Sequence, residues 1–323
     1  MTVLVTGVAG FVGYHVAAAL LARGEQVVGV DNLNAYYDVR LKQARLDRLA
    51  GPAFRFVRLD IADHAALASL VHGTKGIDRL VHLAAQAGVR HSLDDPWAYV
   101  QSNVLGHLAL LEAARHLPGL RHLVYASSSS VYGGNTALPF AEDQRVDTPQ
   151  SLYAATKRAD ELMSQAYSHL FAIPQTGLRF FTVYGPWGRP DMAYFSFAEA
   201  IVAGSPITVY DEGRLRRDFT YIDDIVAGVL GCLDRPPPGA EPRLFNIGNN
   251  RSETVATLIG LLEQALGRPA VTVAAPRPRA DVEETFADVS AIAALTGYVP
   301  RTPLQEGIPR FARWFLQWRA SQA

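Results

Sequence analysis

Short runs of apolar and β-branched residues alternate along this chain with longer segments in which apolar positions recur at helical spacing. The short runs predict strands, and the longer periodic segments predict helices. Strands are predicted at 3–5, 26–30, 54–57, 79–83, 122–125 and 175–179, and helices at 11–23, 65–71, 97–116 and 153–171. Repeated alternation of this kind is typical of an α/β protein with a doubly wound, mainly parallel sheet.

The regular alternation of predicted strands and helices ends at about residue 180. Beyond it, proline and glycine interrupt the apolar segments, as at 236–239 and 276–278. This change predicts two domains, residues 1–180 with the parallel sheet and residues 181–323 as a second, smaller α/β domain that binds substrate. Part of 207–250 is expected to return to the first domain. Asp223 and Asp224 are expected to cap a helix that begins near residue 225.

A glycine-rich loop with the spacing Gly7, Gly10 and Gly13 joins the first predicted strand to the first predicted helix. These glycines permit a tight turn and close approach of a pyrophosphate, which the first amides of the helix would face. Asp31 ends the second strand, where a carboxylate binds an adenosine ribose and repels a 2′-phosphate. The pattern predicts a Rossmann domain that binds NAD, although Asp31 could instead start a turn with Asn32.

Tyr153 and Lys157 lie four residues apart in a predicted helix and therefore share one face. An ammonium beside a phenol favours the phenolate, which makes Tyr153 a candidate general acid and base. The alternative is an ordinary amphipathic helix with a surface lysine. Four further segments directly follow predicted strands and are expected to converge on the same crevice. They are Asp60-Ile61, Ala84-Ala85-Gln86, Ser127–Ser130 and 180–184.

Composition indicates which kinds of partner and cellular location to expect. The chain has 323 residues, 49% of them hydrophobic, and a formal net charge of −1 without a long basic run, which argues against nucleic acid. No charged leader or long apolar segment predicts secretion or a membrane span, and the single cysteine, Cys232, is expected to be a packed thiol in a cytoplasmic protein. The nine histidines lack metal-binding spacing, so no metal site is predicted.

The glycine loop, the Tyr153/Lys157 pair and the serine run before Val131-Tyr132-Gly133 resemble the extended short-chain dehydrogenase/reductase family over nearly the whole chain. Longer strings at 86–90, 179–192 and 217–219 closely resemble nucleotide-sugar 4-epimerases that act on UDP-glucuronate. The resemblance implies a tightly held NAD. Its implied contacts are Gly7, Gly10, Phe11, Val12, Asp31, Asn32, Asp60, Ile61, Leu83, Ala84, Ala85, Asn103, Tyr153 and Lys157.

In such an epimerase, Tyr153 takes the proton of the sugar 4-hydroxyl while hydride passes from C4 to NAD, and the 4-keto sugar is then reduced on its other face. UDP-glucuronate thereby becomes UDP-galacturonate. The hydroxyl is implied to be oriented by Ser128, with Ser127 and Ser129 as alternatives. Ser129 and Ser130 stand where a 4,6-dehydratase has Asp-Glu and where a UDP-glucuronate decarboxylase typically has a glutamate.

The resemblance also implies contacts to a UDP-sugar. They are Arg189, Thr182, Arg90 and Ser127 at the sugar carboxylate, Arg217 at the diphosphate and Tyr210 beside the uracil. The alternative for the arginines is surface or interdomain salt bridging. Ala280 stands where the family usually has glycine, which leaves a phosphate role for Arg277 or Arg279 open.

Two other interpretations stay open. One is a different enzyme of the same fold, such as a UDP-glucose/UDP-galactose-type 4-epimerase or a UDP-glucuronate decarboxylase. The other is a non-catalytic module that binds NAD, which would have no requirement for both Tyr153 and Lys157. The family also suggests a homodimer formed through the helices predicted at 97–116 and 153–171.

Overall fold

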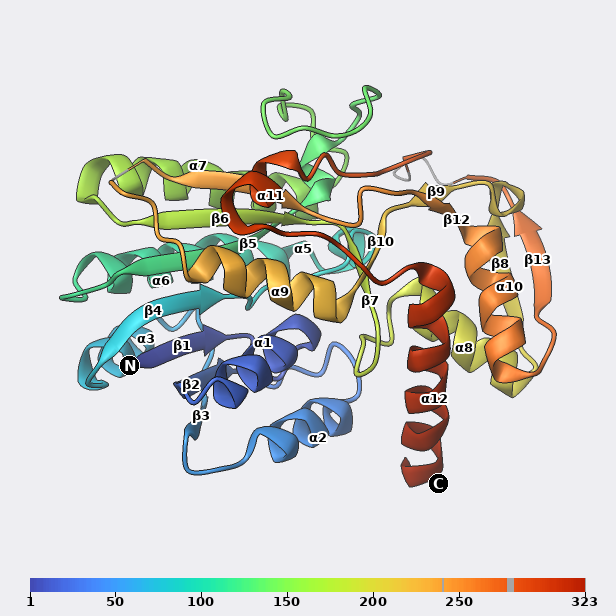
Figure 1. Ribbon diagram of the computed structural model, residues 1–323, viewed down its shortest axis with the longest axis horizontal. Coiled ribbons are helices and arrows are strands. Elements are labelled where there is room, and N and C mark those ends of the chain that lie inside the picture. Colours follow the sequence, from blue (N-terminus) through green and yellow to red (C-terminus); the bar gives the residue numbers. More distant parts are fainter. Residues whose placement is uncertain (240, 278–281, 323) are drawn as a thin grey trace.

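The computed structural model describes residues 1–239, 241–277 and 282–322. Its centre is a sheet of seven strands in the order β11-β6-β5-β4-β1-β2-β3, in which all neighbours are parallel (Figure 1). The doubly wound sheet predicted from the sequence is confirmed. The strands are β1 (Thr2–Thr6), β2 (Gln26–Asp31), β3 (Phe54–Arg58), β4 (Ile77–His82), β5 (His122–Ser128), β6 (Gln175–Phe180) and β11 (Arg243–Ile247).

Helices cover both faces of this sheet (Figure 1). On one face lie α1 (Phe11–Ala22), α2 (Val39–Leu49) and α9 (Ile222–Leu233), and on the other α3 (His64–Gly73), α6 (Gly106–Arg115) and α7 (Leu152–Phe171). Because both faces are covered, the middle of β1 is a continuous apolar run: Val3 and Val5 enter the core of the first face and Leu4 that of the second. No helix in the described ranges is long and apolar enough to span a membrane.

The winding of the chain changes direction at β1, which pairs with β2 on one side and with β4 on the other. In open α/β sheets, ligands bind outside the carboxyl ends of the strands at such a point. The glycine loop after β1 and the segment after β4 therefore lie at the edge where a ligand is expected.

Much of the chain after β6 builds a smaller layer beside the carboxyl edge of the sheet, at the right of Figure 1. In the described part, it contains the strand pairs β7–β10, β8–β13 and β9–β12. Its elements are β7 (Thr182–Tyr184), α8 (Ala193–Ala203), β8 (Pro206–Tyr210), η3 (Asp211–Gly213), β9 (Arg216–Arg217), β10 (Phe219–Tyr221), β12 (Glu253–Thr254), α10 (Val255–Leu266), β13 (Val271–Ala275) and α12 (Leu304–Gln322). The helix α11 (Ser290–Thr296) packs against β11 and α9 instead, and α9 packs against β5 and β6. The domain boundary at residue 180 stays a prediction.

The single helix predicted at 97–116 is three consecutive pieces. After the short α4 (His91–Asp94), the chain forms α5 (Pro96–Tyr99), a π-helical segment η1 (Val100–Leu105) and then α6. The N-cap of α5 is Asp95, which accepts a hydrogen bond from Ala98 N–H at 3.2 Å. The wider turn of a π-helix is frequent at functional sites and leaves no clear mark in apolar periodicity.

The capping role predicted for Asp223 and Asp224 is wrong. The helix α9 begins at Ile222, ahead of both residues. The Asp224 carboxylate instead accepts hydrogen bonds from the backbone N–H groups of Arg301 and Thr302, at 3.1 and 3.0 Å. It therefore fastens the segment before α12 to α9.

Candidate active site

The glycine loop packs backbone against backbone at the carboxyl edge of the sheet. Gly7 has a φ of +71°, and a Cβ there would lie 2.7 Å from the amide nitrogen of Ala84. A Cβ on Gly13 would lie 2.0 Å from the carbonyl oxygen of Gly7. Because the N-cap residue of α1, Gly10, has no side chain, the first amides of the helix stay available to a phosphate. The loop therefore fits the pyrophosphate of a dinucleotide.

Asp31 lies buried beside this loop at the end of β2. One carboxylate oxygen accepts a hydrogen bond from Ala9 N–H at 3.1 Å, and the other accepts one from Leu33 N–H at 2.8 Å. The Leu33 contact is a local turn, but the Ala9 contact ties the carboxylate to the glycine loop, which a turn alone does not explain. Asn32 Nδ2 donates to Asp60 Oδ2 at 3.1 Å, so three predicted cofactor residues lie together.

The other predicted cofactor residues lie at the same edge. Phe11 and Val12 begin α1, Ile61 follows β3, and Leu83, Ala84 and Ala85 follow β4. Asn103 is buried behind them, and its amide donates to Gln86 O at 3.1 Å and to Thr156 Oγ1 at 2.9 Å while accepting from Gln86 N–H at 2.8 Å. Asn103 thus fastens the segment after β4 to α7.

Tyr153 lies in the first turn of α7. Ser151 begins the helix as its N-cap, with Oγ accepting from Ala154 N–H at 3.1 Å. The Tyr153 ring is half-buried and meets Tyr99 edge to face, with ring centroids 6.0 Å apart. Lys157 follows one turn later on the same face, as the sequence spacing predicts.

Lys157 is buried, with its ammonium held between β5 and its own helix. Nζ donates to Ala126 O and to Asp160 Oδ2, both at 3.0 Å. An ammonium has three hydrogens, and the third has no acceptor in the part of the chain that the structure describes. It is available to a ligand hydroxyl.

The three serine candidates have different surroundings. Ser127 and Ser128 are consecutive on β5 and therefore point to opposite faces of the sheet. Ser127 Oγ donates to Glu161 Oε1 at 2.6 Å. Ser128 Oγ accepts from Ser130 N–H at 3.2 Å and donates to Ser130 Oγ at 3.1 Å, and Ser129 begins the short helix η2 (Ser129–Tyr132). The hydroxyl of Ser127 is thus engaged inside the protein, whereas Ser128 lies at the end of the strand.

Arg189 lies on the loop between β7 and α8. Its guanidinium binds Asp191 through two hydrogen bonds of 3.0 and 2.5 Å, and Tyr36 OH donates to the same carboxylate at 3.3 Å. Although burial opposes the charge, Asp191 and, more weakly, Tyr153 raise the pKa of Arg189. A carboxylate-binding cation and the candidate acid and base are therefore within electrostatic reach of each other.

Arg90 and Tyr210 lie against each other, with the guanidinium 4.8 Å from the ring centroid. The resemblance assigns Arg90 to the sugar carboxylate and Tyr210 to the uracil, which are opposite ends of a UDP-sugar. The structure brings the two side chains into contact, and both assignments stay predictions.

The remaining predicted contacts come from the smaller layer. Thr182 begins β7 and pairs with Phe219 of β10. Arg217 Nη1 donates to Arg216 O at 2.8 Å and to Glu283 O at 3.2 Å. Arg277 contacts Glu283 at 3.5 Å, while Arg279 and Ala280 lie outside the described residues.

Comparison with known proteins decides the family. Residues 3–248 match the model of the NAD dependent epimerase/dehydratase family. The chain belongs to this family.

Relatives within this family share most of their length with this chain. A probable UDP-glucuronate 4-epimerase of Rhizobium meliloti is 44% identical, covering 98% of this chain and 97% of the relative. UDP-glucuronate 4-epimerase 3 of Arabidopsis thaliana is 47% identical, covering 98% of this chain and 76% of the relative. The crystal structure of UDP-glucuronic acid 4-epimerase from Bacillus cereus with UDP-glucuronic acid and NAD superposes with a TM-score of 0.92 at 34% identity, over 98% of this chain and 100% of that one.

Sequence reasoning missed Arg45, on a helix that it did not predict. This fully buried guanidinium donates to Ala9 O in the glycine loop at 2.7 Å and to Gly188 O beside Arg189 at 2.9 Å. It therefore connects the predicted cofactor loop to the predicted substrate loop. Lys42, Arg45 and Arg48 share one face of α2 at three-residue spacing, which is the sequence signal that could have indicated the helix.

Other titratable groups near the sheet are kept neutral by burial. Burial lowers the pKa of His82 to about 3 and raises the pKa of the Cys232 thiol to about 12. Among the described residues, no group of three or more His, Cys, Asp or Glu could hold a metal ion.

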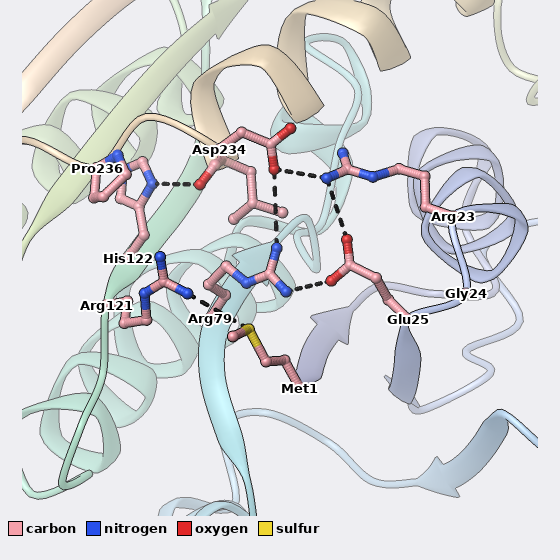
Figure 2. Close-up of a pocket in the computed structure, with 10 residues that line it drawn as sticks. Met1, Arg23, Gly24, Glu25, Arg79, Arg121, His122, Asp234 and Pro236 are labelled. Atoms are coloured by element: carbon pink, nitrogen blue, oxygen red, sulfur yellow. Dashed lines mark hydrogen bonds and ion pairs between the residues drawn. The ribbon is translucent and has the colours of Figure 1, made fainter.

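A cavity of about 330 Å³ opens at the opposite, amino edge of the sheet (Figure 2). Figure 2 shows Arg79 bound to Glu25 and near Asp234, while Arg23 contacts both carboxylates. His122 Nδ1 contacts Leu233 O at 3.1 Å. These charged side chains pair with one another at the edge opposite the glycine loop, and their contacts fasten the sheet to the end of α9. This cavity is therefore not the candidate active site.

Proposed function

We propose that this protein catalyses the reversible C4 epimerisation of UDP-glucuronate to UDP-galacturonate with a resident NAD. The observation that carries the proposal is that the guanidinium of Arg189 lies within electrostatic reach of Tyr153. A sugar whose carboxylate meets the guanidinium of Arg189 presents its ring hydroxyls to the phenol of Tyr153. Solved relatives of this family hold UDP-glucuronic acid and NAD together, which supports the same ligand pair here.

NAD fits the residues at the carboxyl edge of the sheet. The proposed binding set is the glycine loop with Gly7 and Gly10 at the pyrophosphate, Asp31 at the adenosine ribose, and the third hydrogen of the Lys157 ammonium. When bound, NAD supplies reversible hydride acceptance, so oxidation and reduction at the same carbon leave no net redox change.

The chain itself moves the proton. Tyr153 takes the proton of the 4-hydroxyl as the sugar becomes a 4-keto sugar and returns it after the sugar has presented its other face. Ser128 is the serine that we assign to orient the 4-hydroxyl, because its hydroxyl bonds its near neighbour Ser130 at the end of the strand, whereas the hydroxyl of Ser127 is engaged by the buried Glu161. Lys157 stabilises the phenolate by its positive charge.

The carboxylate must survive the reaction, because a 4-keto glucuronate is a β-keto acid that can lose carbon dioxide. Arg189 and Thr182 are the groups proposed to hold it, and guanidinium forks match carboxylates. The half-buried Ser129 and Ser130 offer no carboxylate for the acid and base chemistry of a decarboxylase or dehydratase.

A homodimer and a cytoplasmic location belong to the same proposal. Trp97 and Leu162 are 79% and 54% exposed on α5 and α7, which pack together, so their apolar surface suits a second copy of the chain. The one cysteine is buried and needs no oxidising compartment. Light scattering should give a molar mass twice that of the 35.1 kDa chain, and Leu162→Glu should reduce the measured mass to that of a single chain.

The function is tested by incubating the purified protein with UDP-glucuronate, without added NAD, and resolving products by NMR. UDP-galacturonate is the expected product. Release of a UDP-pentose would instead indicate a decarboxylase. No reaction with UDP-glucuronate but turnover of UDP-glucose would indicate a neutral-sugar epimerase.

A further inference from the structure

Each of the two cations near Tyr153 has its own carboxylate. Arg189 is bound to Asp191, and Lys157 is bound to Asp160. The second pair is the more deeply buried: the side chains of Lys157 and Asp160 are 4% and 1% exposed, and Nζ lies 3.0 Å from Oδ2. The other oxygen, Asp160 Oδ1, has no hydrogen-bond partner among the residues that the structure describes. A buried carboxylate with one unsatisfied oxygen makes folding less favourable, which suggests that Asp160 has a role other than stabilising the fold.

The groups that face this pair from neighbouring elements are uncharged at neutral pH. His82 on β4 and His107 on α6 are fully buried, and burial, together with the nearby Lys157, lowers the pKa of both. Tyr125 on β5 is also buried, which raises the pKa of its phenol. None of these groups offsets the charge of the ammonium.

The nearest other charges form a set of their own. Glu161 on α7 accepts two hydrogen bonds from Arg179 on β6, at 2.8 and 3.0 Å, and one from Arg158 on α7 at 3.0 Å. In the described ranges, Asp160 is the one carboxylate within 4 Å of the Lys157 ammonium. The charge that Tyr153 experiences from this side is therefore the balance between Lys157 and Asp160.

We infer that Asp160 is a positioning residue of the proposed reaction, holding the Lys157 ammonium in place and offsetting part of its charge, so that it sets how readily Tyr153 ionises. This inference rests on the proposed role of Tyr153 as acid and base. Such a group must both take and return a proton, which is most efficient when its pKa lies near the working pH. A buried ammonium without a counter-ion would stabilise the phenolate further and would slow the return of the proton.

The titration of Asp160 itself fits this role. Burial raises the pKa of Asp160 to about 6, although Lys157 opposes the shift. Above that pH the carboxylate is charged and offsets Lys157, and below it the carboxyl is neutral and the full charge of Lys157 acts on Tyr153. Asp160 therefore offsets Lys157 above about pH 6, which is the range in which the native protein and a neutral variant at this position differ.

Asp160→Asn tests the inference, because the amide keeps the shape of the side chain and removes its charge. Turnover of UDP-glucuronate is followed against pH for the native protein and the variant, each with its resident NAD. A neighbouring buried charge changes a pKa by about one unit, so the acid limb of the kcat profile should move to lower pH by about one unit in Asp160→Asn. Asp160→Glu retains the charge and should keep its acid limb close to the native one.

A second measurement does not depend on turnover. The ultraviolet absorbance of the phenolate is titrated in each protein and in its Tyr153→Phe counterpart, and the difference reports Tyr153 alone. Tyr153 should ionise at lower pH in Asp160→Asn. The matched control is Asp47→Asn, which removes one charge from an exposed aspartate of α2 and should leave both curves unchanged.

The outcomes separate the two proposals. Superimposable titrations and pH profiles for the native protein and Asp160→Asn would overturn the inference, including the case in which only the melting temperature changes. If the native protein does not turn over UDP-glucuronate but Tyr153 still ionises at lower pH in Asp160→Asn, the proposed function fails and the inference about Asp160 holds. Asp160→Ser provides a second neutral variant if the amide does not fold.

Discussion

At the scale of single residues, the site combines one phenol with two cations that reach it from different parts of the chain. Lys157 is on the same helix as Tyr153, whereas Arg189 comes from the loop after β7. The sequence spacing predicts the first partner, because residues four apart on a helix are neighbours. It cannot predict that Lys157 binds Asp160 or that Ser127 binds Glu161, because these contacts depend on which side chains are buried together.

Removal of the phenol should stop the chemistry and leave the cofactor in place. In Tyr153→Phe we expect kcat to fall by about 10²- to 10⁴-fold, the range for loss of a general acid and base, while the NAD content of the purified protein stays at the native level. The matched control is Tyr167→Phe, on the same helix but bonded to Glu112. A Tyr153→Phe enzyme with native turnover would contradict the mechanism.

Removal of the Arg189 fork should weaken recognition of the sugar carboxylate. A hydrogen bond between charged groups contributes about 1.5–3 kcal/mol, so kcat/KM for UDP-glucuronate should fall by at least about tenfold in Arg189→Met. Turnover of UDP-glucose, which has no carboxylate, should fall less. Arg189→Lys keeps the charge but not the two-pronged guanidinium, so its kcat/KM for UDP-glucuronate should lie between those of the native protein and Arg189→Met. Equal losses of kcat/KM on UDP-glucuronate and UDP-glucose would mean that Arg189 does not contact the carboxylate.

At the scale of elements, the strands and the long helix α7 follow from apolar periodicity, and their predicted ends lie within a few residues of the observed ones. Among the elements that escape this reasoning, α2 and β11 show why. The helix α2 buries Lys42 and Arg45 among its leucines, so its buried side lacks a clean apolar pattern. The edge strand β11 is recognisable only from its pairing with β6, since three of its five residues are only half-buried.

The junction of β1 and α1 depends on the absence of a side chain at Gly13. A Cβ there would collide with the carbonyl oxygen of Gly7 at 2.0 Å, so α1 must move away from the loop in Gly13→Ala. Overpacking of this kind destabilises a protein by about 1–3 kcal/mol, and we expect loss of resident NAD as well. Chemical denaturation and NAD content provide the measurements.

A glycine in open space is the control for that change. Gly260 lies within α10 with no heavy atom within 4 Å of an added Cβ. Alanine there should stabilise the protein by about 0.5–1 kcal/mol, because it lowers the entropy of the unfolded chain. Equal effects at Gly13 and Gly260 would disprove the packing argument.

At the scale of the whole molecule, His122 joins the central seven-stranded sheet to the end of α9. Its buried ring makes the free energy of unfolding depend on pH. Its ring contacts Thr176 Oγ1 at 2.9 Å and Leu233 O at 3.1 Å, and burial lowers its pKa to about 4. The folded protein keeps this ring neutral, so the unfolded state binds more protons as the pH falls below about 6.5. The stability contributed by His122 is therefore present at neutral pH and is lost on acidification toward pH 4.

The expected size of this effect is about 1.4 kcal/mol of unfolding free energy per pH unit between about pH 6.5 and 4. His122→Gln should be less stable than the native protein at pH 7, and the difference should shrink as the pH falls. His116→Gln, at an exposed position, should keep the native slope. Urea denaturation at several pH values measures the unfolding free energy. If this free energy changes with pH equally in the native protein and in His122→Gln, the prediction is contradicted.

The late return of β11 to the central sheet affects how the chain can fold during synthesis. β6 ends at Phe180 and β11 begins at Arg243, so at roughly 5–20 residues per second the ribosome leaves the outer edge of β6 open for several seconds. An open edge is a template for pairing with other chains. Nascent chains are therefore most prone to aggregate in this interval, and a fragment that stops near residue 180 would keep the hazard permanently, even though it contains the complete glycine loop.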